Sequence, residues 1–303
     1  MTVEEKIPLG DIKGRIDHLA FDPARRRVYV AELGNNSVGI VDMRTRQLIR
    51  TVSGFDEPQG IGYEPSTDTI YVANAGDGSV RVFSGEDFAP LGRIALAQDA
   101  DNVRIDKPAR RVYVGYGSGA LAIIDATTRL KLADIALQGH PESFQLDPSG
   151  DLIFVNVPDA EQIAVVSRAS RRQVATWSTN KLRANYPLAL DPARSRVISI
   201  FRRPARLEAF EMRSGQRVTG SDVCGDSDDV FVDSKRNRVY VICGAGYVDT
   251  FDSSQGTYTR VARLTTSSGS RTGLFVSQLD RLLVAIRASR GEDAAIWVLR
   301  PSP

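Results

Sequence analysis

The sequence predicts an all-β chain folded as a seven-bladed β-propeller with four antiparallel strands in each blade. Three observations lead to this prediction. A short motif built on an anchor residue recurs seven times, at intervals of 42, 42, 41, 44, 42 and 44 residues. A few residues after each anchor comes a run of β-branched and aromatic residues. The seventh copy lacks a fourth strand, which the N-terminal segment supplies. The anchors are Asp22, Glu64, Asp106, Asp147, Asp191, Asp233 and Ser277.

Four strands are expected in each copy, and the first copy illustrates them. The first strand contains the anchor, in Phe21-Asp22-Pro23, and the second reads VYVAE from Val28. The third reads VGIVD from Val38 and the fourth LIRTV from Leu48. Such runs, bounded by Gly, Pro, Asn and Asp, are typical of strands. A four-stranded sheet can bury both faces only between neighbouring sheets, so a period of this length predicts blades.

The N-terminal segment is predicted to close the fold. The seventh copy ends after the third-strand run AIWVL, which begins at Ala295. The segment KIPLGDIKG, residues 6–14, matches a fourth strand such as LGRIAL from Leu91. We therefore expect residues 6–14 to complete the seventh blade, which leaves no edge unpaired at the closure. The whole chain, residues 1–303, is then expected to be a single domain.

Composition excludes several classes of protein. Hydrophobic residues make up 42% and charged residues 25% of the chain, which excludes wholesale disorder. A formal net charge of +2 excludes strong overall basicity. No run of 18 apolar residues and no signal-peptide pattern is present, so we expect a soluble monomer without a transmembrane segment. Two cysteines, Cys224 and Cys243, are too few for a disulfide framework, and each is expected to be a buried free thiol.

The second copy resembles a known repeat. The segment YVAN, Tyr71 to Asn74, and the turn that follows it to Val80 resemble the YVTN repeat of YncE-like bacterial seven-bladed propellers. The segments RIDHLAFD, EPQGIGY and GHPESFQLD are similar to a set of bacterial YncE-like proteins, many of them exported. The resemblance implies the fold and a periplasmic or exported location, with the signal peptide absent from this chain. It implies no activity, because propellers serve as binding modules, lyases, lactonases and oxidoreductases.

Candidate functional residues should gather at the mouth of the channel where the first strands begin, because function concentrates on the loops of such a frame. Five residues before the anchors, the copies carry mainly acidic side chains. The predicted metal ligands, for a divalent cation such as calcium or magnesium, are Asp101, Glu142 and Asp228. The predicted ligand-binding residues are Asp17, His18, Glu32, Gln59, Asn74, Asn102, His140, Asn156, Tyr186, Arg202 and Asp229.

Three hypotheses follow from this acidic mouth. The leading one is a non-enzymatic propeller that binds a small ligand, a metal or a protein partner there. The alternative is a metal-dependent lyase or hydrolase, lactonase-like, acting on a small oxygen-rich substrate, because crowded carboxylates raise one another's pKa and can do acid–base work. A third hypothesis is that these residues only fix the loops through Asx-turns. No GxSxG, HExxH or Walker A motif is present.

The opposite face is expected to be basic. Its turns are rich in arginine, as in Arg25-Arg26-Arg27 and Arg110-Arg111, with Asp22 and Asp106 close by. The acidic residues should cancel much of the positive field. We therefore expect binding to nucleic acid to be at most weak and non-specific.

Overall fold

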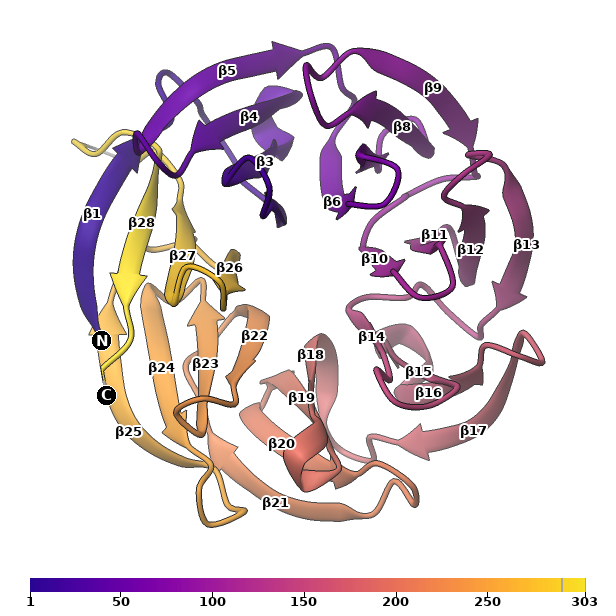
Figure 1. Cartoon of the computed structure of the whole chain (residues 1–303). Coiled ribbons are helices and arrows are strands. Elements are labelled where there is room, and N and C mark those ends of the chain that lie inside the picture. Colours follow the sequence, from indigo (N-terminus) through magenta and orange to yellow (C-terminus); the bar gives the residue numbers. More distant parts are fainter. Residues whose placement is uncertain (290, 303) are drawn as a thin grey trace. The chain divides into compact units, whose positions relative to one another are not determined.

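The protein is described here by a computed structural model, which covers residues 1–289 and 291–302 as strands joined by short turns (Figure 1). The strands form seven antiparallel sheets of four. The chain divides into two compact units: unit 1 holds Met1–Glu5, Glu142–Ile286 and residues 297–302, and unit 2 holds Lys6–Pro141 and Arg287–Ile296. The single domain predicted for the chain stays a prediction.

Unit 2 contains three complete sheets, each ordered as its strands follow in the chain. The first has β2 (Leu19–Asp22), β3 (Arg27–Glu32), β4 (Ser37–Asp42) and β5 (Gln47–Ser53); the second has β6 (Pro58–Glu64), β7 (Thr69–Asn74), β8 (Ser79–Ser84) and β9 (Pro90–Ala95); the third has β10 (Val103–Asp106), β11 (Arg111–Tyr116), β12 (Ala120–Asp125) and β13 (Lys131–Ala136).

Unit 1 contains the next three sheets. The fourth sheet has β14 (Phe144–Leu146), β15 (Leu152–Val157), β16 (Gln162–Ser167) and β17 (Arg172–Ser178); the fifth has β18 (Arg183–Asp191), β19 (Arg196–Arg203), β20 (Ala205–Glu211) and β21 (Arg217–Asp222); the sixth has β22 (Ser227–Asp233), β23 (Arg238–Cys243), β24 (Tyr247–Asp252) and β25 (Thr259–Thr265). Within the described residues three single-turn 3₁₀ elements also occur, η2 (Pro158–Ala160) and η3 (Pro192–Arg194) in unit 1 and η1 (Leu33–Asn35) in unit 2.

The seventh sheet confirms the predicted closure by the N-terminal strand. Its order is β1-β28-β27-β26, made of β26 (Gly273–Val276), β27 (Arg281–Ile286), β28 (Ala295–Arg300) and β1 (Thr2–Pro8). The predicted bounds, residues 6–14, were wrong, because the strand begins four residues earlier, ends six residues earlier and stops before two glycines. Gly10 and Gly14 have φ of +76° and +81°. This left-handed conformation turns the chain out of the extended path.

Buried tyrosines tie the sheets of unit 2 together. Tyr29 and Tyr71 stand at the same position of the second strand in their sheets, and both side chains are fully buried. The Tyr71 hydroxyl donates to the carbonyl of Ala126, just after β12 of the third sheet, at 3.2 Å. The Tyr29 hydroxyl donates to the carbonyl of Gly85, just after β8 of the second sheet, at 3.4 Å. The same side chain therefore supplies apolar packing and satisfies its polar end, as a buried tyrosine must.

The acidic anchors have a structural role that explains their recurrence. Asp22 accepts from the backbone N–H of Ala24 and pairs with Nη1 of Arg25. Nη1 and Nη2 of Arg25 also donate to Asp68, in the turn between β6 and β7, each at 2.7 Å. Asp233, Arg236 and Asp280 repeat this arrangement in unit 1. These arginines of the predicted basic face are thus held in ion pairs between sheets, which lowers the net field that they present.

The fourth strand of six sheets carries a β-bulge at one repeated position. In each case the pairing with the third strand skips one residue, and that residue is an exposed aliphatic side chain. The skipped residues are Ile49, Leu91, Leu132, Val174, Val218 and Val261. A bulge interrupts the row of backbone groups that an edge strand offers to another chain, so each exposed edge is a poor template for strand addition.

Candidate functional site

Both histidines of the chain lie in one group of charged side chains in unit 2, which we call the histidine cluster: Arg15, Asp17, His18, Asp99, Asp101 and His140. The backbone holds its members in place just before the first strands of their sheets. Asp17 N–H donates to the Ala31 carbonyl at 2.7 Å, and Asp101 N–H donates to the Gly115 carbonyl at 2.9 Å. These equivalent bonds extend the pairing of β2 and β10 and fix the two aspartates.

The first pair in the histidine cluster is Asp17 with His18. Asp17 is 1% exposed, and its Oδ2 lies 2.8 Å from Nη2 of Arg15. Its Oδ1 lies 3.7 Å from Nε2 of His18. The carboxylate is therefore buried between a guanidinium and an imidazole.

The second pair is Asp101 with His140. Nδ1 of His140 lies 2.7 Å from the Gly117 carbonyl oxygen and 3.6 Å from Oδ2 of Asp99. A carbonyl oxygen only accepts, so Nδ1 is assigned as the protonated nitrogen. Nε2 faces Oδ2 of Asp101 at 4.0 Å. The imidazole is thus held between acceptors on both sides.

Asp101, the acid of the second pair, is a buried carboxylate. Burial raises the pKa of Asp101, but the interaction with the imidazole of His140 and the positive charges of protonated His18, protonated His140 and Arg15 outweigh it and leave the pKa below its usual range. The carboxylate is therefore ionised at neutral pH. Among the described residues, no group donates to its buried Oδ1.

The other predicted residues of unit 2 divide into two sets. Gln59 touches the histidine cluster, because its side-chain amide donates to Oδ1 of Asp99 at 3.4 Å. Asn102 follows Asp101 and is buried. Glu32 and Asn74 lie inside their sheets with no exposed surface. The side-chain amide of Asn74 donates to the carbonyls of Val72 and Ser79, so both of its N–H groups are hydrogen-bonded to the backbone.

Glu32 is buried beside Gly39, where a side chain at position 39 would collide with its carboxyl oxygen. Its Oε2 accepts a hydrogen bond from Ser37, and its Oε1 has no hydrogen-bond donor among the described residues. Burial raises the pKa of Glu32 to about 7, against the opposing effect of the Ser37 hydroxyl. Glu32 is thus a buried acid that has no arginine as an ion-pair partner among the residues that the structure describes.

The predicted residues of unit 1 are largely paired with one another. The guanidinium of Arg202 lies over the ring of Tyr186, 4.0 Å from its centroid. The same guanidinium contacts Oδ1 of Asp228 at 2.7 Å and Oδ1 of Asp226 at 3.4 Å. Arg271 also pairs with Asp226. This group is held together by ion pairs, so its charges are already compensated.

Three further predicted residues of unit 1 form hydrogen bonds with backbone groups: Asn156, Asp229 and Glu142. The Asn156 amide donates to the carbonyls of Tyr186 and Pro187, and Asp229 accepts from the N–H of Gly273 at 2.9 Å. The Glu142 N–H donates to the Asn156 carbonyl at 3.0 Å. In the part of the chain that the structure describes, no three His, Cys, Asp or Glu side chains are grouped to hold a metal ion. The predicted ligand set of Asp101, Glu142 and Asp228 stays a prediction.

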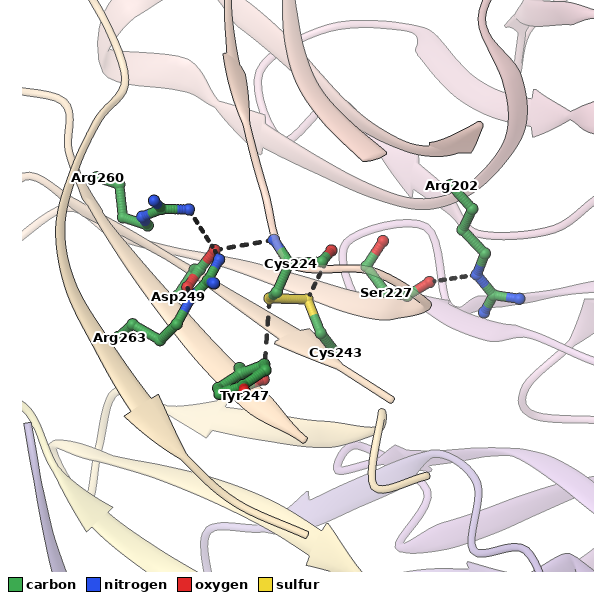
Figure 2. The surroundings of a disulfide bond; sticks show 8 residues. All are labelled: Arg202, Cys224, Ser227, Cys243, Tyr247, Asp249, Arg260 and Arg263. Atoms are coloured by element: carbon green, nitrogen blue, oxygen red, sulfur yellow. Dashed lines mark hydrogen bonds and ion pairs between the residues drawn. A yellow bond between two sulfur atoms is a disulfide. The ribbon is translucent and has the colours of Figure 1, made fainter. Parts of the chain in front are cut away.

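The expectation of free thiols was wrong, because Cys224 and Cys243 form a disulfide (Figure 2). Cys243 ends β23 and pairs with Ser227 at the start of β22. Cys224 lies three residues before Ser227, and the intervening loop folds back so that the two Cα atoms are 5.9 Å apart. This separation falls within the usual range for disulfides. The sequence contains both cysteines, but no local pattern indicates that the loop brings Cys224 next to Cys243.

A buried ion group stands beside the disulfide (Figure 2). The Asp249 carboxylate has no exposed surface and accepts two bonds from Arg263, at 2.6 and 2.8 Å. Arg260 lies 3.5 Å away, and the N–H of Cys224 donates to the same carboxylate at 2.9 Å. The loop that leads to Asp226 is therefore fixed both covalently and by a charge-assisted hydrogen bond.

Sequence reasoning did not single out Arg15 and Asp99. Asp99 belongs to the acidic run Asp99-Ala100-Asp101, which was a usable signal. No sequence signal pointed to Arg15, because it stands outside the aligned positions of the repeat. It joins the histidine cluster through its contact with Asp17.

Comparison with known proteins gives the fold and no family. No protein-family model and no curated protein matches this chain. A chain in a crystal structure of the mitotic checkpoint complex matches with a TM-score of 0.83 and 14% identity, over 99% of this chain and 92% of that one. A chain of hydrazine synthase from Kuenenia stuttgartiensis matches with a TM-score of 0.80 and 17% identity, over 97% and 96%.

These likenesses, together with seven sheets of four strands, decide the fold. The chain is a seven-bladed β-propeller. The propeller matches 1814 chains of solved structures, so the fold by itself does not select a function. The described residues contain no helix with the length and apolar character needed to cross a membrane.

Proposed function

We propose that this propeller is a binding module whose histidine cluster takes a small, positively charged ligand. The observation that supports the proposal is the charge of the cluster. Among the described members of the cluster, three carboxylates, those of Asp17, Asp99 and Asp101, are accompanied by one guanidinium, that of Arg15. Above the usual pKa of imidazole the cluster therefore keeps two negative charges.

Burial makes these charges effective. Asp17 and Asp101 are buried, so their field is screened less by water than that of surface carboxylates. Asp99, with a side chain 51% exposed, and the partly exposed imidazoles of His18 and His140 are the groups that a ligand reaches first. The exposed members would contact the ligand, and the buried aspartates would supply the attraction.

The metal-dependent lyase or hydrolase has less support. Such an enzyme needs a set of convergent ligands, and the described part of the chain groups no three suitable side chains. The His140–Asp101 pair is the feature that favours an enzyme, because an imidazole beside a carboxylate can act as a general base. A protein partner would use the same charges through a lysine or arginine side chain.

Calorimetric titration tests the proposal with 1,4-diaminobutane, calcium chloride and magnesium chloride, each at pH 8 and pH 6. We expect at least one of them to bind at pH 8 and to bind about tenfold more weakly at pH 6, because protonated imidazoles cancel the negative charge. Asp101→Asn should weaken that binding about tenfold or more. Asp11→Asn, at an exposed acid outside the cluster, should leave it unchanged.

Two outcomes would contradict the proposal. One is the absence of heat for all three probes at both pH values. The other is binding that Asp101→Asn leaves intact, since the ligand would then lie elsewhere on the molecule.

A further inference from the structure

We propose a second binding site, separate from the histidine cluster, which takes a small organic anion with an apolar body. It is a cavity of about 390 Å³ in unit 1, between the fourth and fifth sheets. Lys181, Leu182, Phe210 and Arg217 are among the residues that line it. Cavities of this size lie within the range of small-molecule sites.

The loop from β17 to β18 forms one wall of the cavity and is firmly held. The backbone N–H and the hydroxyl of Thr179 both donate to the Glu161 carbonyl, each at 2.9 Å. Leu182 N–H donates back to the Thr179 carbonyl at 3.0 Å, and Asn180 takes a left-handed conformation with φ of +56°. The loop thus holds Leu182 half-buried and leaves Lys181 exposed.

The floor of the cavity is aromatic and closely packed. Phe210 is buried and stacks on Trp177 with a centroid distance of 6.3 Å. Gly215 has φ of +71°, and a Cβ on it would come within 2.4 Å of the Trp177 ring. Only glycine lets the turn between β20 and β21 lie this close to the indole. The apolar surface is therefore preformed.

The charge at the cavity is positive. Lys181 and Arg217 are its ionisable lining residues, and none of the described lining residues is acidic. The Nε–H and Nη2–H groups of Arg217 donate to the buried Glu208 at 2.6 and 2.8 Å, which fixes the guanidinium. Nη1 has no hydrogen-bond partner among the described residues and can meet a ligand. Arg206 also binds Glu208. A carboxylate, sulfonate or phosphate group matches these donors, and an aromatic or aliphatic body matches the floor.

The test uses 8-anilinonaphthalene-1-sulfonate, an aromatic sulfonate that fluoresces in apolar surroundings, on the full chain. We expect saturable binding that quenches tryptophan emission, because Trp177 lies under the floor. Lys181→Gln should weaken binding about fivefold to tenfold, and Lys181→Glu should weaken it further. Lys107→Gln, at an exposed lysine of unit 2, and Asp101→Asn, in the histidine cluster, should leave it unchanged.

Two reference compounds separate charge from apolar contact. Sodium sulfate offers charge alone, and N-phenyl-1-naphthylamine offers the rings alone, so each should bind at least tenfold more weakly than the sulfonate. Equal binding of the uncharged amine, or an unchanged dissociation constant in both Lys181 variants, would overturn the proposal. Because Lys181 is exposed, its variants should fold, and their far-ultraviolet circular dichroism verifies that directly.

Discussion

Removal of residues 1–13 is expected to lower the free energy of unfolding by about 5 kcal/mol or more, which leaves little or no folded protein at 37 °C. The deletion removes β1 and the residues after it, in which Ile7, Leu9 and Ile12 are all buried. Truncating one such side chain to alanine costs about 2–5 kcal/mol. The deletion also removes the strand that pairs with β28. Arg281 and Arg300 lose the carboxylate of Glu4, with which both form ion pairs.

Urea unfolding followed by tryptophan fluorescence measures this effect. A matched control is Val3→Ser, which changes an exposed residue of the same strand and should shift stability by less than about 0.5 kcal/mol. A truncated chain that unfolds at the same urea concentration as the full chain would refute the closure of the seventh sheet by the N-terminal strand.

Loss of the disulfide has the second largest expected effect. Cys224 and Cys243 are 19 residues apart, and a cross-link that closes a loop of this size stabilises the folded state by about 3 kcal/mol, mainly by restricting the unfolded chain. We therefore expect the Cys224→Ser, Cys243→Ser double variant to be less stable than the wild type by that amount. Disulfides persist in oxidising compartments, so we expect an exported location for this chain.

Urea unfolding with and without dithiothreitol tests this prediction. Reductant should shift the unfolding midpoint of the wild type toward that of the double serine variant, while the variant itself should not respond. A wild-type midpoint that stays unchanged after complete reduction of the sulfurs, shown by thiol titration, contradicts it.

The sequence predicted the sheets well because the signal repeats. The anchor Asp22 and its equivalents recur at nearly constant spacing. The acidic side chain caps the following turn at Asp22, Glu64, Asp106, Asp147 and Asp233, and three anchors, Asp22, Asp191 and Asp233, also pair with an arginine. The N-terminal strand lacks an anchor, so its bounds were misplaced. The disulfide was missed because the approach of Cys224 to Cys243 depends on a loop that no local pattern describes.

The candidate site was predictable only in part. Asp17 and Asp101 occupy equivalent positions before β2 and β10, so the alignment of copies found both. His140 stands outside that position and is brought to Asp101 by the loop between β13 and β14, where it meets the Gly117 carbonyl. Glu32 and Asn74 were placed at the mouth, yet they are the last residues of β3 and β7 and lie buried in their sheets.

The histidine cluster can be observed directly, because His18 and His140 are the two histidines of the chain and give two imidazole signals in a proton–carbon NMR spectrum. The measurement that tests the central claim is a titration of this spectrum with the cation that calorimetry identifies. We predict that both signals shift with one dissociation constant, equal to the calorimetric value, and that neither shifts in Asp101→Asn. Binding by calorimetry with both imidazole signals unmoved would contradict the claim, since the ligand would then occupy another part of the molecule.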